Sequence, residues 1–203
     1  MQTVNFNNTT ITPSKIICIG RNYVDHITEL GNEIPDEMVV FFKANSSIST
    51  LLHASHQEPL HYEAELCFLY NQGKFCAVAL GLDLTKRALQ AKLKAKGLPW
   101  ERAKAFDGAA VFSDFVAIDT IDDSLSLQLS INDEVVQAGG VGLMMYKPDV
   151  ILSQLHEFTT LEDGDIVMTG TPKGVGEVIA GSKFSGKVFS LNEALVSVTW
   201  NAK

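Results

Sequence analysis

The sequence predicts a β-rich α+β fold, in which a mixed sheet rolls into a barrel-like shape, and assigns residues 1–203 to a single domain. The main observation is that short apolar or alternating segments, separated by Gly, Asn or Asp, recur along the chain. Such segments are typical of strands, whereas only a few segments have helical composition. The second observation is the length, which is enough for one domain with a substantial core.

The first half of the chain is predicted to combine strands with two helices. A short helix is expected at residues 21–30, stopped by Gly31, and a second at residues 85–96, stopped by the Gly-Leu-Pro sequence at 97–99. Residues 100–108 are expected to form a loop. Strands are expected at residues 15–19, 38–42, 61–70, 75–82 and 109–112.

The second half is predicted to be mostly β-structure. Residues 125–131 alternate in hydrophobicity, and the pair Asn132-Asp133 is typical of a hairpin turn into residues 134–137. A helix is expected at residues 148–158, because Pro148 suits the first helical turn. Further strands are expected at residues 165–169, 188–189 and 194–198, with a rigid Gly-rich loop at 169–176.

The strand predicted at residues 61–70 carries two glutamates on one face. Because side chains alternate along a strand, Glu63 and Glu65 point the same way, roughly 7 Å apart. Cys67 and Leu69 continue this face and are apolar, so the face is not simply solvated. Two like charges side by side repel, and a hard divalent cation such as Mg²⁺ would neutralise them. The alternative is an ordinary solvated strand face, since short motifs often occur by chance.

Composition limits the classes of partner and the compartment. The net charge of -8 and the absence of a Lys/Arg block argue against nucleic acid and anionic membranes as partners. The three cysteines have no metal-ligand spacing and are odd in number, which argues against a disulfide framework or a cysteine zinc site. The N-terminal residues show no signal or transit pattern, and no apolar run is long enough to span a membrane. A cytoplasmic location is therefore expected.

Four stretches in register resemble the fumarylacetoacetate hydrolase family. They are Gly20-Arg21-Asn22-Tyr23 with His26 and Glu29, the pair Glu63 and Glu65, Gly97-Leu98-Pro99-Trp100 with Lys104, and the Thr-Gly-Thr-Pro-Lys-Gly-Val-Gly sequence at residues 169–176. The chain is most similar to small single-domain members, the acylpyruvases and the related oxaloacetate decarboxylases and 2-hydroxyhepta-2,4-diene-1,7-dioate isomerases. The resemblance covers residues 15–198.

The resemblance implies the β-roll of the family's C-terminal domain, a homodimer, and Mg²⁺ or Mn²⁺ as the cofactor. By motif match the metal ligands are Glu63, Glu65 and Asp83. The sequence departs from the family pattern in two places. The stretch between Glu65 and Asp83 is shorter than usual, which makes Asp83 the least secure ligand. Ala88 follows Arg87 where the family tends to carry an acidic residue, so a supporting ion pair is expected to be missing there.

The resemblance also implies roles for six further residues. His26 and Glu29 lie three residues apart, on one helix face, where the carboxylate can orient an imidazole that takes a proton from water. Lys104 is implied to stabilise an enolate. The residues implied to hold substrate are Arg21, Gln90 and Thr171. The alternatives are a solvated helix face for the His-Glu pair, surface positions for the arginine and lysine, and a simple tight turn around the threonine.

The function implied in this way is hydrolysis of a C–C bond in small β-dicarbonyl acids of the acylpyruvate or fumarylpyruvate type. Pyruvate would leave through an enolate held at the metal, as a step in catechol or aromatic degradation. The same site could support oxaloacetate decarboxylation or isomerisation of an unsaturated dioate, because both need the same charge stabilisation. A non-catalytic metal- or ligand-binding protein is a further alternative. In each case the expected partner is a small anionic keto acid.

Overall fold

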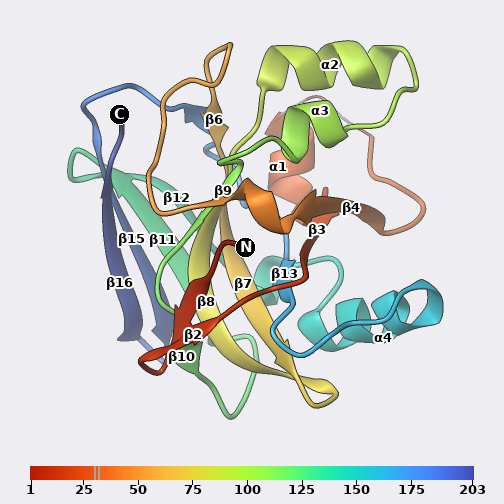
Figure 1. Cartoon of the computed structure of the whole chain (residues 1–203), viewed down its shortest axis with the longest axis vertical. Coiled ribbons are helices and arrows are strands. Elements are labelled where there is room, and N and C mark those ends of the chain that lie inside the picture. The colour runs from red at the N-terminus through yellow and green to blue at the C-terminus, as the bar shows by residue number, and fades with distance from the viewer. Residues whose placement is uncertain (30, 32) are drawn as a thin grey trace.

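The computed structural model describes residues 1–29, 31 and 33–203 and confirms the predicted β-rich α+β fold (Figure 1). The helices of this described part are α1 (Val24–Glu29), α2 (Arg87–Ala95), α3 (Glu101–Lys104), α4 (Pro148–Phe158) and the 3₁₀ turns Asn45–Ser47 and Val141–Leu143. Its strands are β1 (Val4–Phe6), β2 (Thr9–Ile11), β3 (Lys15–Gly20), β4 (Val39–Ala44), β5 (Ile48–Ser49), β6 (His61–Tyr62), β7 (Ala64–Asn71), β8 (Lys74–Asp83), β9 (Ala110–Phe112), β10 (Val116–Ala117), β11 (Ser126–Ile131), β12 (Glu134–Gly140), β13 (Ile166–Met168), β14 (Gly176–Glu177), β15 (Lys183–Ser190) and β16 (Glu193–Asn201).

A large mixed sheet forms the centre of the molecule. Its strand order is β4-β3-β13-β7-β8-β9-β5, and β10 pairs with β8. The pairs β13–β3 and β5–β9 are parallel, and the other pairs are antiparallel. Strand β7 is buried on both faces, because its even-numbered residues join the main core cluster while Cys67 and Leu69 join a second one. The glutamate face of this strand therefore leads into a core, as its apolar continuation predicted.

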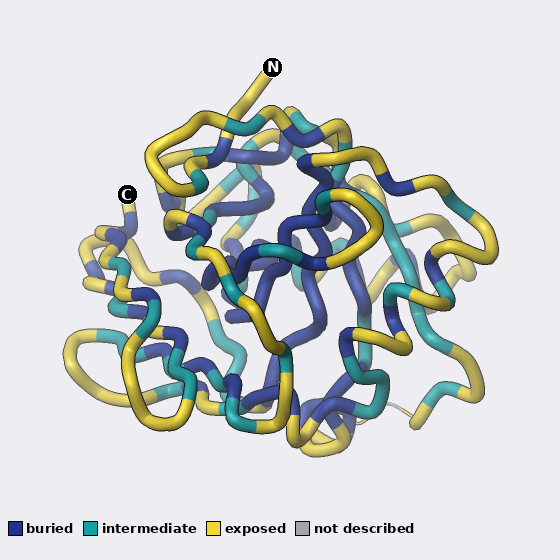
Figure 2. The backbone as a smooth tube through the Cα atoms, turned by 90° about the horizontal axis from the view of Figure 1, so that it is seen from below, coloured by how far each residue is buried: buried dark blue, intermediate teal, exposed yellow. Residues whose placement is uncertain are grey.

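A second, antiparallel sheet has the order β12-β11-β15-β16 and packs against the first. The two sheets approach closely where Gly186 faces Leu80, since a Cβ atom at Gly186 would lie 1.9 Å from a Leu80 methyl carbon. Side chains of both sheets fill the main core cluster. Figure 2 shows the buried backbone gathered in the middle of the molecule, with most of the exposed segments around it.

Helix α4 has the predicted bounds, whereas the other helices differ from expectation. Helix α1 begins at Val24 rather than at Arg21, whose φ of 56° is outside the helical region, and Leu30 lies outside the described residues. Helix α2 is shorter than predicted, and the expected loop at 100–108 contains the short helix α3. Figure 1 shows α1, α2 and α3 grouped near one end of the large sheet. Among the described residues, no helix has both the length and the apolarity to cross a membrane.

The prediction of one strand at residues 61–70 was wrong in one respect that matters for the site. The chain leaves one sheet and enters another at Glu63, because β6 pairs with β14 whereas β7 pairs with β13 and β8. Strands β7 and β8 are joined by a tight turn at Gln72-Gly73, where both residues have positive φ. This hairpin brings Asp83, the last residue of β8, beside Glu63, to whose carbonyl oxygen the Asp83 N–H donates at 2.9 Å.

The C-terminal hairpins follow the predicted pattern but are longer. Asn132 and Asp133, with φ of 50° and 69°, form the turn between β11 and β12. The strands predicted at 188–189 and 194–198 are parts of β15 and β16, which extend from Lys183 to Ser190 and from Glu193 to Asn201. In these extensions exposed polar residues alternate with buried ones, so the sequence lacks the apolar run from which the strands were predicted.

Candidate metal centre and active site

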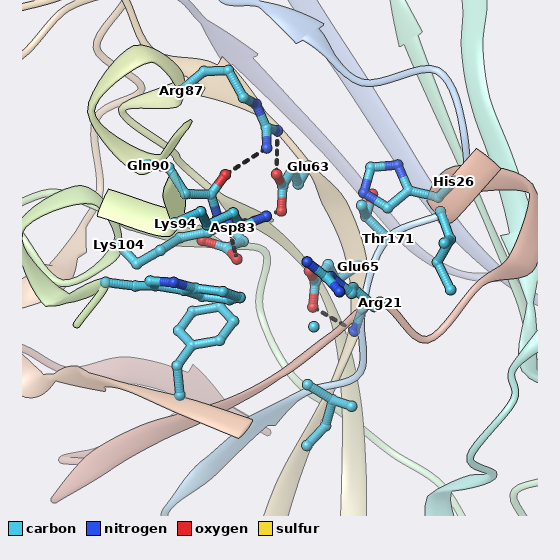
Figure 3. A pocket seen from close by; sticks show the side chains of 16 residues that line it. Arg21, His26, Glu63, Glu65, Asp83, Arg87, Gln90, Lys94, Lys104 and Thr171 are labelled. Carbon is cyan, nitrogen blue, oxygen red and sulfur yellow. Dashed lines mark hydrogen bonds and ion pairs between the residues drawn. The ribbon is translucent and has the colours of Figure 1, made fainter. Parts of the chain in front are cut away.

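Three carboxylates meet where β7 begins and β8 ends. Glu63, Glu65 and Asp83 each offer an oxygen that lies within 4.8 Å of those of the other two. All three residues are buried, with exposed fractions between 1% and 6%. Figure 3 shows their side chains in one pocket. The shortened connection after Glu65 therefore does not keep Asp83 away from the two glutamates.

The electrostatic environments of the two glutamates differ. The pKa of Glu65 is raised well above its ordinary value by burial and by the neighbouring Asp83 and Glu63 carboxylates, although its Oε2 accepts a hydrogen bond from the Gly170 N–H at 2.8 Å. Burial acts on Glu63 in the same direction, but the charges of Lys104 and Arg87 outweigh it and lower the pKa of Glu63. Glu65 is thus the carboxylate that most lacks a cation.

Two pocket cations contact the carboxylate cluster. Lys104 Nζ lies 2.9 Å from Glu63 Oε2 and 2.7 Å from Asp83 Oδ2. These two anions raise the pKa of Lys104 although burial acts to lower it. The Arg87 guanidinium pairs with Glu63 and donates to Gln90 Oε1 at 2.8 Å. Arg87 therefore has a carboxylate partner in the site itself, despite the alanine that follows it.

Lys43 is a site residue that sequence reasoning missed. Its side chain on β4 is fully buried, and its Nζ lies 2.8 Å from Asp83 Oδ1. A buried ammonium without a counter-charge is strongly unfavourable, so this ion pair fixes both partners. The signal in the sequence is a single lysine directly after the apolar residues 38–42.

The donor set fits a hard divalent cation. Carboxylate oxygens are the ligands that Mg²⁺ and Mn²⁺ prefer, and a few carboxylates together with water and substrate oxygens complete their octahedral shell. From the described part of the chain, the Glu65 carboxylate accepts a hydrogen bond from the Gly170 N–H. Its remaining lone pairs are available to a metal. The residues that could hold the ion are Glu63, Glu65 and Asp83.

Helix α1 carries the predicted histidine and glutamate as a contacting pair. His26 Nδ1 lies 3.3 Å from Glu29 Oε2, and His26 is buried and lines the pocket. The Glu29 carboxylate also accepts the Gly174 N–H at 3.0 and 3.1 Å. Gly174 has a φ of 99°, and a Cβ there would lie 1.9 Å from the Val136 carbonyl oxygen, so a side chain is excluded. The Gly-rich loop thereby holds the helix that carries His26.

The loop at residues 169–176 engages the Thr171 hydroxyl within the protein. The Thr171 hydroxyl donates to the Ala64 carbonyl oxygen and accepts from Gln137 Nε2, both at 2.8 Å, instead of presenting its proton to the pocket. The backbone N–H groups of this loop that meet carboxylates are those of Gly170, on Glu65, and of Gly174, on Glu29. The local reason is that β7 leaves the Ala64 carbonyl oxygen without a strand partner on this side, and the hydroxyl satisfies it.

One pocket brings eight of the nine predicted site residues together. Glu29 is the exception: it does not line the pocket but contacts His26. The lining residues that sequence reasoning did not select include Phe41, Arg87, Lys94 and Trp100.

Comparison with known proteins places this architecture in a family. Residues 15–198 match the family described as fumarylacetoacetate (FAA) hydrolase C-terminal. The oxaloacetate tautomerase of Bos taurus, a mitochondrial protein, is 38% identical over 182 residues, which cover 80% of this chain and 81% of that protein. The oxaloacetate tautomerase of Escherichia coli is 35% identical, with 85% and 87% covered. Because one relative is named mitochondrial, a cytoplasmic location stays a prediction.

Solved structures agree with this assignment. The fumarylpyruvate hydrolase of Pseudomonas aeruginosa, in complex with Mn²⁺ and pyruvate, superposes with a TM-score of 0.87 at 27% identity, covering 100% of this chain and 96% of that one. A yeast fumarylacetoacetate hydrolase family protein superposes with a TM-score of 0.81 at 31% identity, covering 95% and 94%. The relatives named here as a tautomerase or a hydrolase are enzymes. This chain belongs to the fumarylacetoacetate hydrolase family.

Proposed function

We propose that this protein is a divalent-metal-dependent enzyme that converts small 2-oxo acids carrying a second carbonyl group, by way of their enol form. The observation that carries the proposal is the meeting of three buried carboxylates, a buried lysine and a histidine in one small pocket. Bound Mg²⁺ or Mn²⁺ would act as a Lewis acid that polarises the 2-oxo group. Glu63, Glu65 and Asp83 would hold the ion.

Lys104 and His26 supply the chemistry that the chain itself would contribute. The Lys104 ammonium is fixed by Glu63 and Asp83, so it needs no reorganisation to stabilise negative charge that develops on a substrate oxygen beside the cluster. His26 lies in the same pocket and is oriented by Glu29 through Nδ1, which leaves Nε2 to exchange protons with substrate or water.

Keto–enol tautomerisation of oxaloacetate is the reaction we place first. In this reaction His26 would take a proton from C3 and a proton would be returned to the oxygen on C2, so that no bond between heavy atoms breaks. The names of the Bos taurus and Escherichia coli relatives support this choice of substrate. Arg21, Gln90 and Thr171 line the pocket and are proposed to position the substrate, Thr171 through its backbone.

Hydrolysis of acylpyruvates is the second candidate, favoured by the contact between His26 and Glu29. In this reaction His26 would take a proton from water, whose oxygen attacks the distal carbonyl carbon. The C–C bond then breaks, and its electron pair passes to the pyruvate enolate. Protonation of that enolate at carbon gives pyruvate, and the other product is a carboxylic acid. The structural neighbour from Pseudomonas aeruginosa, a fumarylpyruvate hydrolase, supports this candidate. Oxaloacetate decarboxylation and dioate isomerisation would use the same enolate stabilisation.

A turnover assay with oxaloacetate and acylpyruvates, with Mg²⁺ or Mn²⁺ and with EDTA, tests the proposal. We expect metal-dependent turnover that EDTA abolishes, with oxaloacetate tautomerisation the fastest reaction. Metal binding without turnover of any of these substrates would refute the enzyme and leave a ligand-binding protein. The same preparation also tests the predicted homodimer, which light scattering would report as twice the chain mass.

Two variants separate the candidate reactions. General-base catalysis typically contributes on the order of 10²–10⁴ in rate, so His26→Ala should reduce kcat for acylpyruvate cleavage by about that factor. Decarboxylation needs no activated water and should fall much less. Lys104→Ala should reduce both, because it removes the charge that both enolates need. An equal loss of both reactions in His26→Ala would show that the histidine handles a shared proton or closes the site.

A further inference from the structure

One face of α2 lines the pocket with three polar side chains. Arg87, Gln90 and Lys94 are spaced by three and four residues, so they lie on the same side of the helix, and Figure 3 shows them reaching into the pocket. The helix rises about 1.5 Å per residue, which places the Cα atoms of Arg87 and Lys94 about 10 Å apart along its axis. Arg87 pairs with Glu63. Lys94 is therefore the cation of this face that lies farther along the pocket from the glutamate.

Lys94 lines the pocket and has no carboxylate partner in the part of the chain that the structure describes. Among the described residues, its recorded close contact is with an aromatic ring, since its Nζ lies 4.8 Å from the centre of the Trp100 ring. Its side chain is half-buried, and burial, together with the positive charge of Arg21, lowers the pKa of Lys94 to about 8. Lys92, two residues earlier, is exposed and does not line the pocket. The structure thus holds the Lys94 ammonium where its charge is poorly compensated.

The charge balance of the pocket favours a dianion. Its described lining contains three carboxylates against four cations, Arg21, Arg87, Lys94 and Lys104. Arg87 and Lys104 form ion pairs with the carboxylate cluster, so their positive charges are largely neutralised by it. A divalent ion at the cluster would add to the positive excess. A substrate with one negative charge at the metal would leave Lys94 uncompensated, whereas a second carboxylate at the other end would neutralise it.

We propose that Lys94 binds the distal carboxylate of the substrate and selects dicarboxylic over monocarboxylic 2-oxo acids. This inference rests on the proposed function, because the 2-oxo end must lie at Glu63, Glu65 and Asp83 for the far end to reach Lys94. Lys94 acts on specificity and takes no part in proton transfer. The Trp100 ring covers the aliphatic stem and limits the positions that the ammonium can adopt.

Malate and lactate are suitable test ligands for calorimetric titration of the Mg²⁺-loaded protein. They are stable α-hydroxy counterparts of oxaloacetate and pyruvate, with the same head group, and differ by the distal carboxylate. Wild type should bind malate more tightly than lactate. Lys94→Met should raise the Kd of malate by about 10- to 100-fold, the usual cost of one charge-assisted hydrogen bond, and leave that of lactate within about twofold. Lys94→Arg should retain most of the preference, and Lys92→Met, the matched control on the same helix, should behave as wild type.

The outcomes separate this inference from the proposed function. Equal affinities of wild type and Lys94→Met for malate, or an equal loss for malate and lactate, would overturn the inference. Absence of a preference for malate in wild type would overturn it as well. The proposed function fails separately, as absent turnover of oxaloacetate and acylpyruvates by wild type. Lost discrimination in Lys94→Met would still establish the dicarboxylate site in that case.

Discussion

Two buried carboxylates of this protein, Asp165 and Glu65, have opposite surroundings. Both are almost fully inaccessible, at 0% and 2% exposed. Asp165 accepts hydrogen bonds from the backbone N–H groups of Ser14, Lys15 and Glu162, from the Ser14 hydroxyl and from the Lys15 ammonium. Burial alone would raise the pKa of Asp165, but these donors lower it. Glu65 accepts the Gly170 N–H and has two carboxylates as neighbours, and its pKa is raised.

The difference indicates what each carboxylate does. Asp165 directly precedes β13, and its donors Ser14 and Lys15 tie that strand to the start of β3, its parallel neighbour in the sheet. Its charge is satisfied by the chain itself, so it serves the fold. Glu65 is surrounded by groups that disfavour its charge, which is unfavourable for the protein alone and favourable once a cation binds. A buried carboxylate that the chain provides with few hydrogen-bond donors and no cation is the one expected to bind an ion.

The largest expected effect follows from removing the charge of Glu65. Glu65→Gln keeps the volume and the acceptor for the Gly170 N–H but removes one carboxylate of the cluster. We expect turnover to fall by at least about 100-fold, since even indirect supports of metal ligands cost about 10- to 100-fold. The free energy of unfolding of the metal-free protein should stay equal or increase, because a repulsion is relieved. Steady-state assays and urea titrations would measure both, with the exposed Glu193→Gln as the control.

The converse substitution should affect the fold and spare the site. Asp165→Asn removes the acceptor charge that faces five donors, and we expect it to reduce the free energy of unfolding by about 2–4 kcal/mol. Metal affinity and kcat of the folded fraction should stay within about twofold of wild type. Chemical denaturation would measure the loss, with the exposed Asp119→Asn as the control. Loss of metal binding in folded Asp165→Asn would break the distinction between the two carboxylates.

A smaller effect is expected in the pH dependence of stability. The pKa of Asp165 is lower in the folded protein than the value near 3.9 of an unfolded chain, so the unfolded state binds the proton first as the pH falls. The stabilisation by Asp165 is therefore fully present above about pH 5 and declines below about pH 4, through the folded pKa. The difference in unfolding free energy between wild type and Asp165→Asn should narrow over this acidic range. A difference that is constant down to pH 3 would contradict the assignment.

The sequence predicted those parts of the site that depend on local periodicity and motif. Alternation along a strand placed Glu63 and Glu65 on one face, and helical spacing placed His26 beside Glu29, as the 3.3 Å contact of the latter pair shows. The start of α4 followed from its proline, which suits the first helical turn. The fumarylacetoacetate hydrolase fold followed from motifs in register, because no single short motif is specific enough.

Features set by tertiary pairing could not be predicted in this way. The break of the strand at Glu63 arises because the chain changes sheets there, which depends on β14, more than 100 residues later. Lys43 is buried because Asp83 compensates its charge across the sheet, and no local pattern records that partner. The inward hydrogen bond of Thr171 depends on a carbonyl oxygen of β7 in the same way. Long-range neighbours, rather than propensity, decide these positions.

The central claim is that the carboxylate cluster, and not buried acid in general, holds a divalent ion. Its most direct test is the stabilisation that Mg²⁺ or Mn²⁺ confers on wild type, Glu65→Gln, Asp83→Asn and Asp165→Asn in thermal unfolding without substrate. At a metal concentration of about 100 times Kd, wild type and Asp165→Asn should gain about 2.7 kcal/mol. Glu65→Gln and Asp83→Asn should gain little. Equal stabilisation of all four proteins by the metal would contradict the claim.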